Sequence, residues 1–371
     1  MKKIKIITFH NAHNYGAFLQ VFALQKKLSE NNDIEIINYE NQEIKKVYKL
    51  IHINKSNIKK FIKSLISNIV FLRKKIIKYY KFNKSIKKRL VLTPKKYISE
   101  NDLKNNPPNA DIYITGSDQV WNSELTHGLC DSYTLNFGPI GTKRISYGAS
   151  IGNTVLSRNE EEIYKNKISK IDFISVREEE GKKLLESIGI NKPIEVVIDP
   201  TMLLHKEDWD KMIGEDRLIN KKYILAYVLD SDSEYRKIVN ELANKTGLKI
   251  VHFEVRENKY KKNNLKSAYA SNPFEFVNLI KNAEYVVCTS FHATVFSIIF
   301  NKKFWVIPHR KTGSRVTNLL EKLGIAERAI NNIVEFEKLD YDKEIDYDKA
   351  NKKLEEERKK SIDWLNKAIN S

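Results

Sequence analysis

Apolar runs and segments of helical period alternate along the first half of the chain. The run KIKIITF at 3–9 is short and apolar, and Ala17 to Leu28 after it has apolar residues at the spacing of one helix face. Strand-like runs return at 34–39, 111–116, 144–150, 172–178 and 194–200, with helical segments at 159–169 and 178–188. Strands that alternate with helices predict a parallel sheet covered on both faces.

The pattern restarts after a linker at 199–215. Further strands are expected at 223–229, 249–255, 284–288 and 304–308, with helices at 233–246, 273–281 and 293–300. A last helix, at about 346–369, has one apolar stripe, which is typical of a strap that packs back; the stripe consists of Leu354, Trp364, Leu365 and Ile369. We predict an α/β protein of two Rossmann-like domains facing a cleft. The domains are 1–205 and 216–345, followed by the helix 346–371.

Composition favours a soluble globular protein. The 371 residues are enough for two cores, and 41% are hydrophobic and 30% charged. Cys130 and Cys288 lack metal-ligand spacing, so disulfides and structural zinc are not expected. Lys5 interrupts the apolar start, which disfavours a signal peptide, and no segment has the roughly 18 apolar residues of a membrane span. We expect a cytoplasmic protein.

The formal net charge of +18 lies in one segment. Ile44 to Tyr97 contains eighteen Lys or Arg and no Asp or Glu, whereas the rest of the chain has 47 residues of each sign. Between Ile58 and Tyr80, apolar residues recur at roughly helical spacing among lysines, which predicts a basic helical insert, 44–97, in the first domain. Such a helix lies on an anionic membrane surface, or it packs its apolar stripe on the domain while its lysines face water.

Polar turns follow several predicted strands, at the edge where open α/β sheets usually bind ligands. Asn14-Tyr15-Gly16 leads directly into a helix, whose first N–H groups suit anions or hydroxyl-rich ligands. The stretch is not GxGxxG and lacks the downstream acid, so dinucleotide binding is disfavoured. His10 and His13 are either ligands or exposed turn residues without a role.

Two more strand ends in the first half offer chemistry. In GSDQVWN, Asp118 can act as a base or bind sugar hydroxyls, and Trp121 can stack on a sugar ring; the alternative is an Asp N-cap with a buried Trp. Arg177 offers a fork for a carboxylate or phosphate. Its alternative, an ion pair with Glu178 or Glu180, is weaker because neighbours on the following helix point elsewhere.

The second half adds a histidine and a cationic turn. His292 stands where the apolar strand 284–288 turns into the apolar helix 293–300, either as a ligand or as a histidine that satisfies a buried backbone group. PHRKTGSR predicts an anion site, with a solvated charge run as the alternative; its cationic residues are His309, Arg310, Lys311 and Arg315. GxSxG, HExxH and P-loop patterns are absent from the sequence, so serine hydrolase, zinc protease and kinase readings lack support.

Ordered blocks along the chain resemble the polysaccharide pyruvyltransferase family. The blocks are TFHNAHNYGAFLQVFALQ, ITGSDQVWN, SYGASIG, SVRE, VIDPTMLL, TSFHATVFSIIFNKKFWVIP and GSRVTNLLEKLGI. They run from residue 4 to 325, with Ala293 where relatives often have glycine and NKKF where NKPF is common. The resemblance implies a GT-B-like fold of two Rossmann-type domains. It also implies transfer of pyruvate from phosphoenolpyruvate (PEP) to a sugar, usually as a cyclic ketal on two hydroxyls.

The resemblance gives the candidate residues roles. It implies that His292 donates a proton to PEP or binds the departing phosphate, and that Asp118 is the base or orients the acceptor. The carboxylate and phosphate of PEP would be held by Arg177, Arg310, Lys311 and Arg315. The acceptor would be bound by Asn14, Tyr15, Gly16, Gln119 and Trp121. Neither a redox cofactor nor a metal is expected.

Two other functions fit parts of the pattern. One is a GT-B-type glycosyltransferase that uses a nucleotide sugar. The other is a polyanion-binding protein, although the basic segment has few aromatics placed for stacking and no recognised nucleic-acid fold, so nucleic acid is not an expected partner. We expect the acceptor to be a sugar of a cell-surface polysaccharide or exopolysaccharide, or its lipid-linked precursor. Peripheral attachment at the inner membrane face through 44–97 would suit the lipid-linked form.

Overall fold

A computed structural model of the protein describes residues 1–48, 58–152, 155–228, 233–255, 260, 262–308 and 313–371. The chain forms two compact units. Unit 1 consists of residues 1–48, 85–204 and 355–371, and unit 2 consists of residues 49–84 and 205–354.

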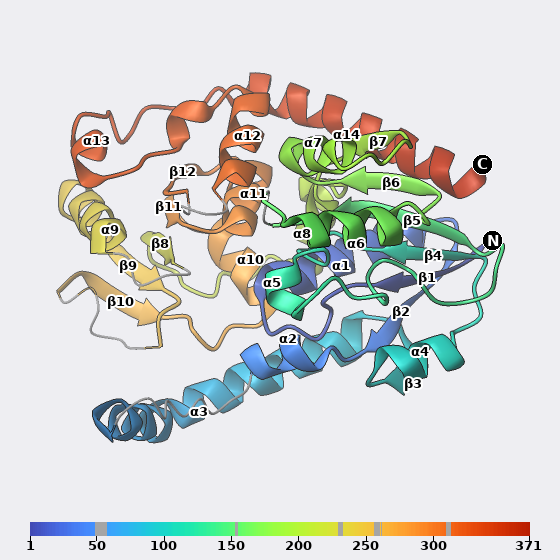
Figure 1. Ribbon diagram of the computed structural model, residues 1–371. Helices are drawn as coiled ribbons and strands as arrows, with labels where there is room; N and C mark the ends of the chain where they lie inside the picture. Colours follow the sequence, from blue (N-terminus) through green and yellow to red (C-terminus); the bar gives the residue numbers. More distant parts are fainter. Residues whose placement is uncertain (49–57, 153–154, 229–232, 256–259, 261, 309–312) are drawn as a thin grey trace. The chain divides into compact units, whose positions relative to one another are not determined.

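The core of unit 1 is a seven-stranded parallel sheet with the strand order β3-β2-β1-β4-β5-β6-β7 (Figure 1). The first six strands of this order have the arrangement of a Rossmann fold. Their bounds are β1 Lys3–Ile7, β2 Asp33–Tyr39, β3 Leu92–Tyr97, β4 Ile112–Thr115, β5 Lys143–Ala149, β6 Phe173–Val176 and β7 Ile194–Val196.

Helices of unit 1 follow most of these strands, as a parallel sheet requires. Their bounds are α1 Tyr15–Leu28, α2 Gln42–Val47, α4 Glu100–Asn105, α5 Ser123–Thr126, α6 Arg158–Ile168, α7 Glu179–Ser187 and the 3₁₀ turn η1 Pro200–Met202. Every residue of β4 is buried, and so are most residues of α1. Apolar residues predominate in both segments, because neighbours cover them on several sides.

Unit 2 repeats the plan with five parallel strands in the order β10-β9-β8-β11-β12. The strands are β8 Tyr223–Tyr227, β9 Lys249–His252, β10 Asn264–Ser267, β11 Tyr285–Cys288 and β12 Lys303–Val306. The helices are α8 Lys206–Ile213, α9 Ser233–Thr246, α10 Pro273–Lys281, α11 Phe291–Ile299, α12 Ser314–Leu323, η3 Ala326–Arg328 and α13 Ile333–Glu337. The predicted α/β class, with two Rossmann-like parallel sheets, is confirmed.

Two strands escaped the sequence analysis, and both lie at the edge of a sheet. β3 contains a proline and two lysines, and β10 is mostly polar. Edge strands tolerate proline and charge because one side of the strand has no strand neighbour. Their sequences therefore lack the apolar run that marks a central strand.

The C-terminal strap helix is confirmed as α14, Tyr347–Asn370 (red in Figure 1). Leu365 and Ile369 of its predicted stripe are buried, and the ring of Trp364 packs 6.4 Å from that of Tyr147 in unit 1. The Arg358 guanidinium donates to the Met202 carbonyl at 2.7 Å. Residues 355–371 therefore pack in the core of unit 1 and form hydrogen bonds with the rest of that unit.

The basic segment differs from its prediction in two ways. It ends in strand β3, so it is not helical throughout, and most of it belongs to unit 2 instead of the first domain. Its main element is α3, Ile58–Arg89, the long blue helix of Figure 1. Lys81 of α3 binds both carboxylate oxygens of Glu275 at 2.8 Å, which accounts for its place in unit 2.

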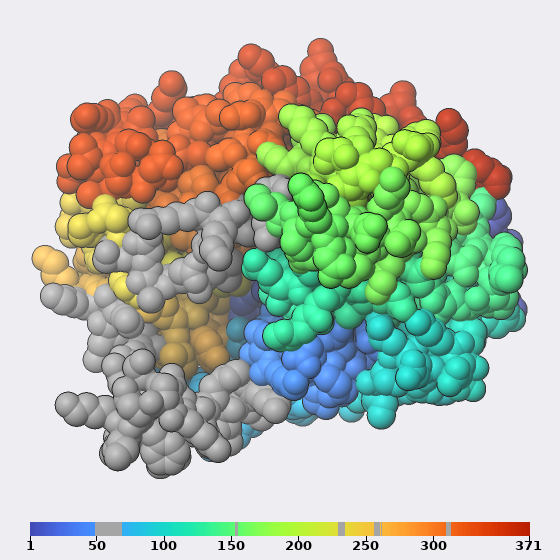
Figure 2. All heavy atoms as spheres, in the orientation of Figure 1, coloured from blue at the N-terminus to red at the C-terminus, as the bar shows by residue number. Residues whose placement is uncertain are grey.

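Lysines of the basic segment also form ion pairs at the edge of the sheet in unit 1. Glu40 follows β2 and accepts from Lys45 of α2 at 2.6 Å and from Lys96 of β3 at 2.9 Å. In Figure 2 the blue surface that includes α2 lies beside the cyan surface that includes β3. Part of the positive charge therefore serves the fold.

Candidate active site

The strand order of each unit predicts where a ligand binds. In unit 1, the chain leaves β1 toward β2 on one side and later returns to β4 on the other. The carboxyl ends of two such neighbouring strands border the crevice in which open α/β sheets bind ligands. Asn14 follows β1 and Asp118 follows β4, so both predicted site residues flank this switch point.

Asp118 lies part-exposed in a tight turn. Its carbonyl accepts from the Ser150 N–H at 2.9 Å, and its Oδ1 accepts from the Gln119 N–H at 2.7 Å. At Gly116, two residues earlier, an added Cβ would lie 3.1 Å from the Thr8 Cβ. Glycine therefore allows the turn after β4 to approach β1, and the backbone bonds fix Asp118 at the switch point.

Asn14 caps helix α1, and its side-chain oxygen accepts from the N–H groups of Gly16 at 2.9 Å and Ala17 at 3.3 Å. Tyr48, at the end of α2, hydrogen-bonds the Asn14 side chain. Burial and then the charge of Asp118 raise the pKa of Tyr48 to about 12, although the Asn14 bond opposes them. Tyr48 is therefore a further residue of the candidate site, beside Asn14 and Asp118. The sequence analysis did not identify it, because it lies in the basic segment.

Arg177, after β6, lies in a buried network of opposite charges. Its Nε donates to Glu178 Oε1 at 3.0 Å and its Nη1 donates to Asp199 Oδ2 at 3.1 Å. Ser117 donates to Asp199 at 3.3 Å and Ser150 donates to Glu178 at 2.9 Å. Side-chain hydrogen bonds and ion pairs therefore connect the carboxyl ends of β4, β5, β6 and β7.

The ion pair with Glu178, which the sequence analysis considered weaker, is present. Glu178 is the N-cap of α7 with extended backbone angles, so it does not point away with the helix. Burial by itself lowers the pKa of Arg177, but Glu178 and Asp199 more than offset it and raise the pKa. Only 2% of the Arg177 side chain is exposed. The role of Arg177 in holding PEP stays a prediction.

Two residues predicted to contact the acceptor are buried. Trp121 is 0% exposed and donates its Nε1–H to the Tyr133 carbonyl at 3.0 Å, so it has no face for a sugar. Tyr15 is likewise buried in α1. The buried Trp of the alternative is therefore present, but the helix after it is capped by Asn122 and not by Asp118.

Gly16 and Gln119 are placed by the same turns. Gly16 is buried at the start of α1, where its N–H already bonds Asn14. Gln119 is part-exposed and accepts from Asn122 at 2.8 Å. At Gly152, which has φ +75°, an added Cβ would lie 2.5 Å from the Gln119 Oε1. A glycine is therefore needed beside Gln119.

His10 is fully buried, contrary to its reading as an exposed turn residue. Its Nδ1 lies 3.4 Å from the Thr8 carbonyl. Burial lowers the pKa of His10 to about 4, against the smaller effects of Thr8 and Asn38. The imidazole is therefore neutral at physiological pH and belongs to the core.

His292 occupies the corresponding switch point of unit 2, between β8 and β11. Its neighbours Phe291 and Ala293–Ile299 are buried, whereas His292 is part-exposed at the second position of α11. Its ring packs edge-on against Phe291, with centroids 5.3 Å apart. A part-exposed histidine inside an otherwise buried helix start suits a ligand-contacting role.

The predicted anion site is described only in part. His309, Arg310 and Lys311 lie outside the described residues. Arg315 is part-exposed at the second position of α12, the helix that follows β12. The residue that holds the anion in this turn therefore stays a prediction.

Comparison with known proteins places the chain in a family. The sequence model of the family described as polysaccharide pyruvyl transferase matches residues 14–311. The chain belongs to this family. The match begins at Asn14, after β1, and extends past β12, so Asn14, Asp118 and His292 lie inside it. A search of curated proteins found no match.

Three solved structures resemble most of the chain. S. aureus MnaA with UDP is 14% identical over 91% of this chain and 86% of its own, with a TM-score of 0.52. Methanocaldococcus jannaschii UDP-GlcNAc 2-epimerase is 15% identical over 96% and 92%, with a TM-score of 0.49. Arabidopsis thaliana UGT89C1 is 9% identical over 98% and 94%, with a TM-score of 0.48. The chain thus has a GT-B-like fold, and the likeness shows no more than the fold.

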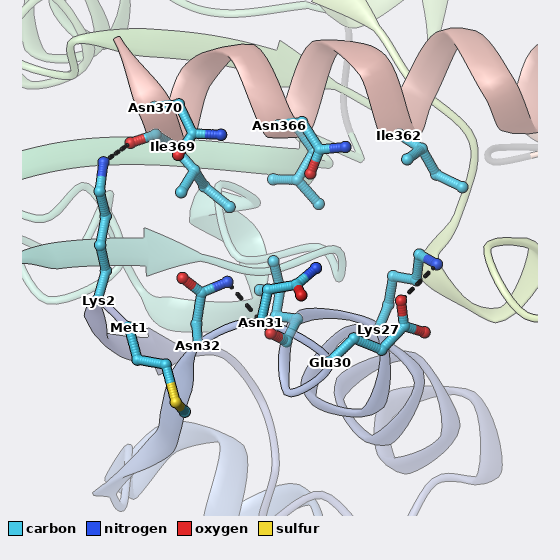
Figure 3. A pocket seen from close by; sticks show the side chains of 12 residues that line it. Met1, Lys2, Lys27, Glu30, Asn31, Asn32, Ile362, Asn366, Ile369 and Asn370 are labelled. Atoms are coloured by element: carbon cyan, nitrogen blue, oxygen red, sulfur yellow. Dashed lines mark hydrogen bonds and ion pairs between the residues drawn. The ribbon is translucent and has the colours of Figure 1, made fainter.

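A pocket of about 520 Å³ lies elsewhere on unit 1 (Figure 3). It is lined by Lys2 before β1, by Asn31 and Asn32 before β2, and by the end of α14. These segments border the amino ends of the strands, opposite the switch point, so the pocket contains none of the predicted site residues.

The described part of the chain contains neither a membrane-spanning helix nor a cluster of metal-ligating side chains. No helix there is long and apolar enough to cross a membrane. No group of three or more His, Cys, Asp or Glu side chains there is placed to hold a metal ion.

Proposed function

We propose that the protein transfers pyruvate from PEP to two hydroxyls of a saccharide and forms a cyclic ketal. The observation that carries the proposal is the family match over residues 14–311, which includes His292 and Asp118. The acceptor is a sugar of a cell-surface polysaccharide or exopolysaccharide, or its lipid-linked precursor. No redox cofactor or metal takes part in the proposed chemistry.

The proposed chemistry begins with a proton transfer to the methylene carbon of PEP. The new methyl group leaves C2 with oxocarbenium character, and a sugar hydroxyl oxygen bonds to C2 and loses its proton to a base. The C2–O bond to phosphate then breaks, inorganic phosphate leaves, and the second hydroxyl closes the ketal and releases its proton. A positioned acid, a base and cationic groups near the phosphate lower the barrier for these steps.

The proposal assigns these groups to the predicted site residues. His292 gives the proton or binds the departing phosphate, and its part exposure at a helix start supports this role. Asp118 acts as the base or orients the acceptor, with Asn14 and Gln119 on the acceptor side. Arg310, Lys311 and Arg315 hold the anion, and Arg177 adds its charge from inside the network with Glu178 and Asp199.

The experiment measures inorganic phosphate released from PEP with a panel of acceptor sugars, lipid-linked ones included. Release should require both an acceptor and PEP, and the product should gain one pyruvate. A parallel arm offers UDP-sugars as donors, because MnaA of similar fold was solved with UDP. Sugar transfer from a UDP-sugar, without release of phosphate from PEP, would replace the proposal with a glycosyltransferase.

The proposal includes a location. A lipid-linked acceptor would be reached from the inner face of the membrane, where the basic segment 44–97 attaches the protein peripherally. The segment's eighteen cations and absence of acids support this part of the proposal.

A further inference from the structure

Helix α3 has an apolar stripe on its exposed side. We name as the outer stripe the residues Ile69, Val70, Ile76, Ile77 and Tyr80, which recur at the spacing of one helix face. Ile69 is 68% exposed and Tyr80 is 64% exposed. Large apolar side chains gathered on one exposed face mark an interaction surface, whereas single ones are ordinary.

The opposite side of α3 is already occupied within unit 2. Lys81 binds Glu275, Lys74 donates to the Val255 carbonyl at 3.4 Å, and the Lys78 ammonium lies 4.9 Å from the Tyr269 ring centroid. Phe82 on this side is buried. Between Ile69 and Tyr80 the helix thus packs largely through lysines and exposes its apolar stripe, the reverse of the packed-stripe alternative.

Charge identifies the partner of the outer stripe. α3 contains twelve Lys or Arg and no Asp or Glu, and Arg73, Lys84 and Lys87 are exposed along the face of the stripe. A second copy of the helix would bring cations against cations. A phosphate backbone would pair with the cations but leave the aliphatic residues in water. An anionic bilayer accepts both, because cations meet head groups while apolar side chains enter the interface.

We propose that the outer stripe of α3 docks on the surface of an anionic phospholipid bilayer. The helix lies in the plane of the interface, with Ile69, Ile76 and Tyr80 among the acyl chains near the head groups. Arg73, Lys84 and Lys87 contact the lipid phosphates. This inference deepens the proposed location and rests on it, but it does not depend on pyruvyl transfer.

The first experiment is co-sedimentation of the full chain with phosphatidylcholine vesicles, with and without phosphatidylglycerol. Binding should require phosphatidylglycerol and should weaken as salt rises. Equal, weak binding to both vesicle types would overturn the proposal. Vesicle binding is measured without substrates, so its failure and a failure of pyruvyl transfer are seen separately.

Two sets of variants separate charge from insertion. Arg73→Gln, Lys84→Gln and Lys87→Gln together should weaken binding roughly fivefold for each charge removed. Their matched control removes three exposed lysines of α14, with Lys352→Gln, Lys359→Gln and Lys367→Gln. Equal loss in the control would mean that net charge, and not α3, causes binding, which would overturn the proposal.

Ile69→Gln, Ile76→Gln and Tyr80→Gln together leave the cations in place and should reduce binding at least tenfold. The control replaces exposed apolar residues elsewhere, with Ile98→Gln, Ile140→Gln and Leu218→Gln. All these sites are exposed, so circular dichroism should show unchanged helicity. Normal vesicle binding by the α3 triple variant would overturn the proposal. So would a concentration-dependent dimer of the wild type that this variant abolishes without changing vesicle binding, since the stripe would then contact a second copy.

Discussion

His292 is part-exposed at the start of a helix whose other residues are buried. We predict that His292→Asn lowers the rate of phosphate release from PEP by about 100-fold or more, because a positioned acid or base contributes on this scale. The melting temperature should stay within a few degrees of the wild type, since asparagine keeps a neutral polar side chain at this part-exposed position. His127→Asn, at an exposed site, is the control for both readouts. Near-normal turnover of a folded His292→Asn protein would remove His292 from the proposed chemistry.

A second histidine, His10, should act on stability instead of turnover. Its pKa is about 4 in the folded protein, against an ordinary value of 6.5. Between these pH values the unfolded chain binds a proton that the folded protein does not, so stability falls as pH decreases from 6.5 to 4. We expect His10 to contribute a loss of about 3 kcal/mol over this range.

Urea unfolding at several pH values checks this prediction. His10→Gln should flatten the dependence between pH 6.5 and 4, whatever its effect on absolute stability. His127→Gln should leave the slope unchanged. A His10→Gln protein with the wild-type slope would assign the acid sensitivity to other groups.

The charged network around Arg177 leads to a third prediction, which concerns the stability of the protein. Asp199 is fully buried and accepts from Ser117, Arg177 and both donors of Thr201. Asp199→Asn would leave a buried guanidinium with half of its compensating charge, so we expect the free energy of unfolding to fall by about 3 kcal/mol. Glu179→Gln, at an exposed site on α7, should change it by less than about 0.5 kcal/mol. Equal stability of Asp199→Asn and wild type in urea would contradict the account of a charge-balanced core.

At the scale of elements, helix α1 ties the fold to the acceptor side. Asn14→Ala removes the oxygen that caps α1 and should cost about 1 kcal/mol of unfolding free energy. Asn14→Asp keeps a capping oxygen and should retain stability, but it loses the amide and places a second carboxylate near Asp118. Acceptor affinity should therefore fall in both variants, whereas stability falls only in the first. Asn41→Ala, which uncaps α2, is the control for stability alone.

The elements also show why some structure was predictable. β1, β4 and β11 are buried along almost their whole length, so their apolar runs predict strands without further information. β3 and β10 are strands because neighbours supply hydrogen-bond partners, and a polar sequence shows no sign of that. The spacing of apolar residues in a sequence reflects which side chains are buried. An edge strand needs few buried side chains, so its sequence shows little of this pattern.

The candidate site was predictable to a similar degree. Strand ends located Asn14, Asp118 and His292, because parallel topology alone brings such positions to switch points. Burial was not readable in the same way. Trp121 and Arg177 are in polar, turn-like sequence, yet the structure buries both behind segments far along the chain.

At the scale of the whole molecule, charge divides into two kinds. Some cations of the basic segment are paired with acids from elsewhere in the chain, as Lys96 is with Glu40 and Lys81 with Glu275. Others, such as Arg73 and Lys84, are exposed on α3. The count of charges gave the location of the segment, but only the packing distinguishes cations that brace the protein from those that face a partner.

The discontinuity of unit 1 has a consequence for biosynthesis. Ser361 and Arg358 bond Ile198 and Met202, and Lys143 donates to the carbonyls of Ala368 and Ile369. These partners leave the ribosome only after residues 205–354 have been translated. The seven-stranded sheet of unit 1 therefore lacks α14 until the second sheet has been translated. During that time, the surface that α14 covers is exposed. Ribosome-bound chains that end before residue 355 should be cut by protease in unit 1 more readily than released chains, and a chaperone that shields apolar surface would find its substrate in that interval.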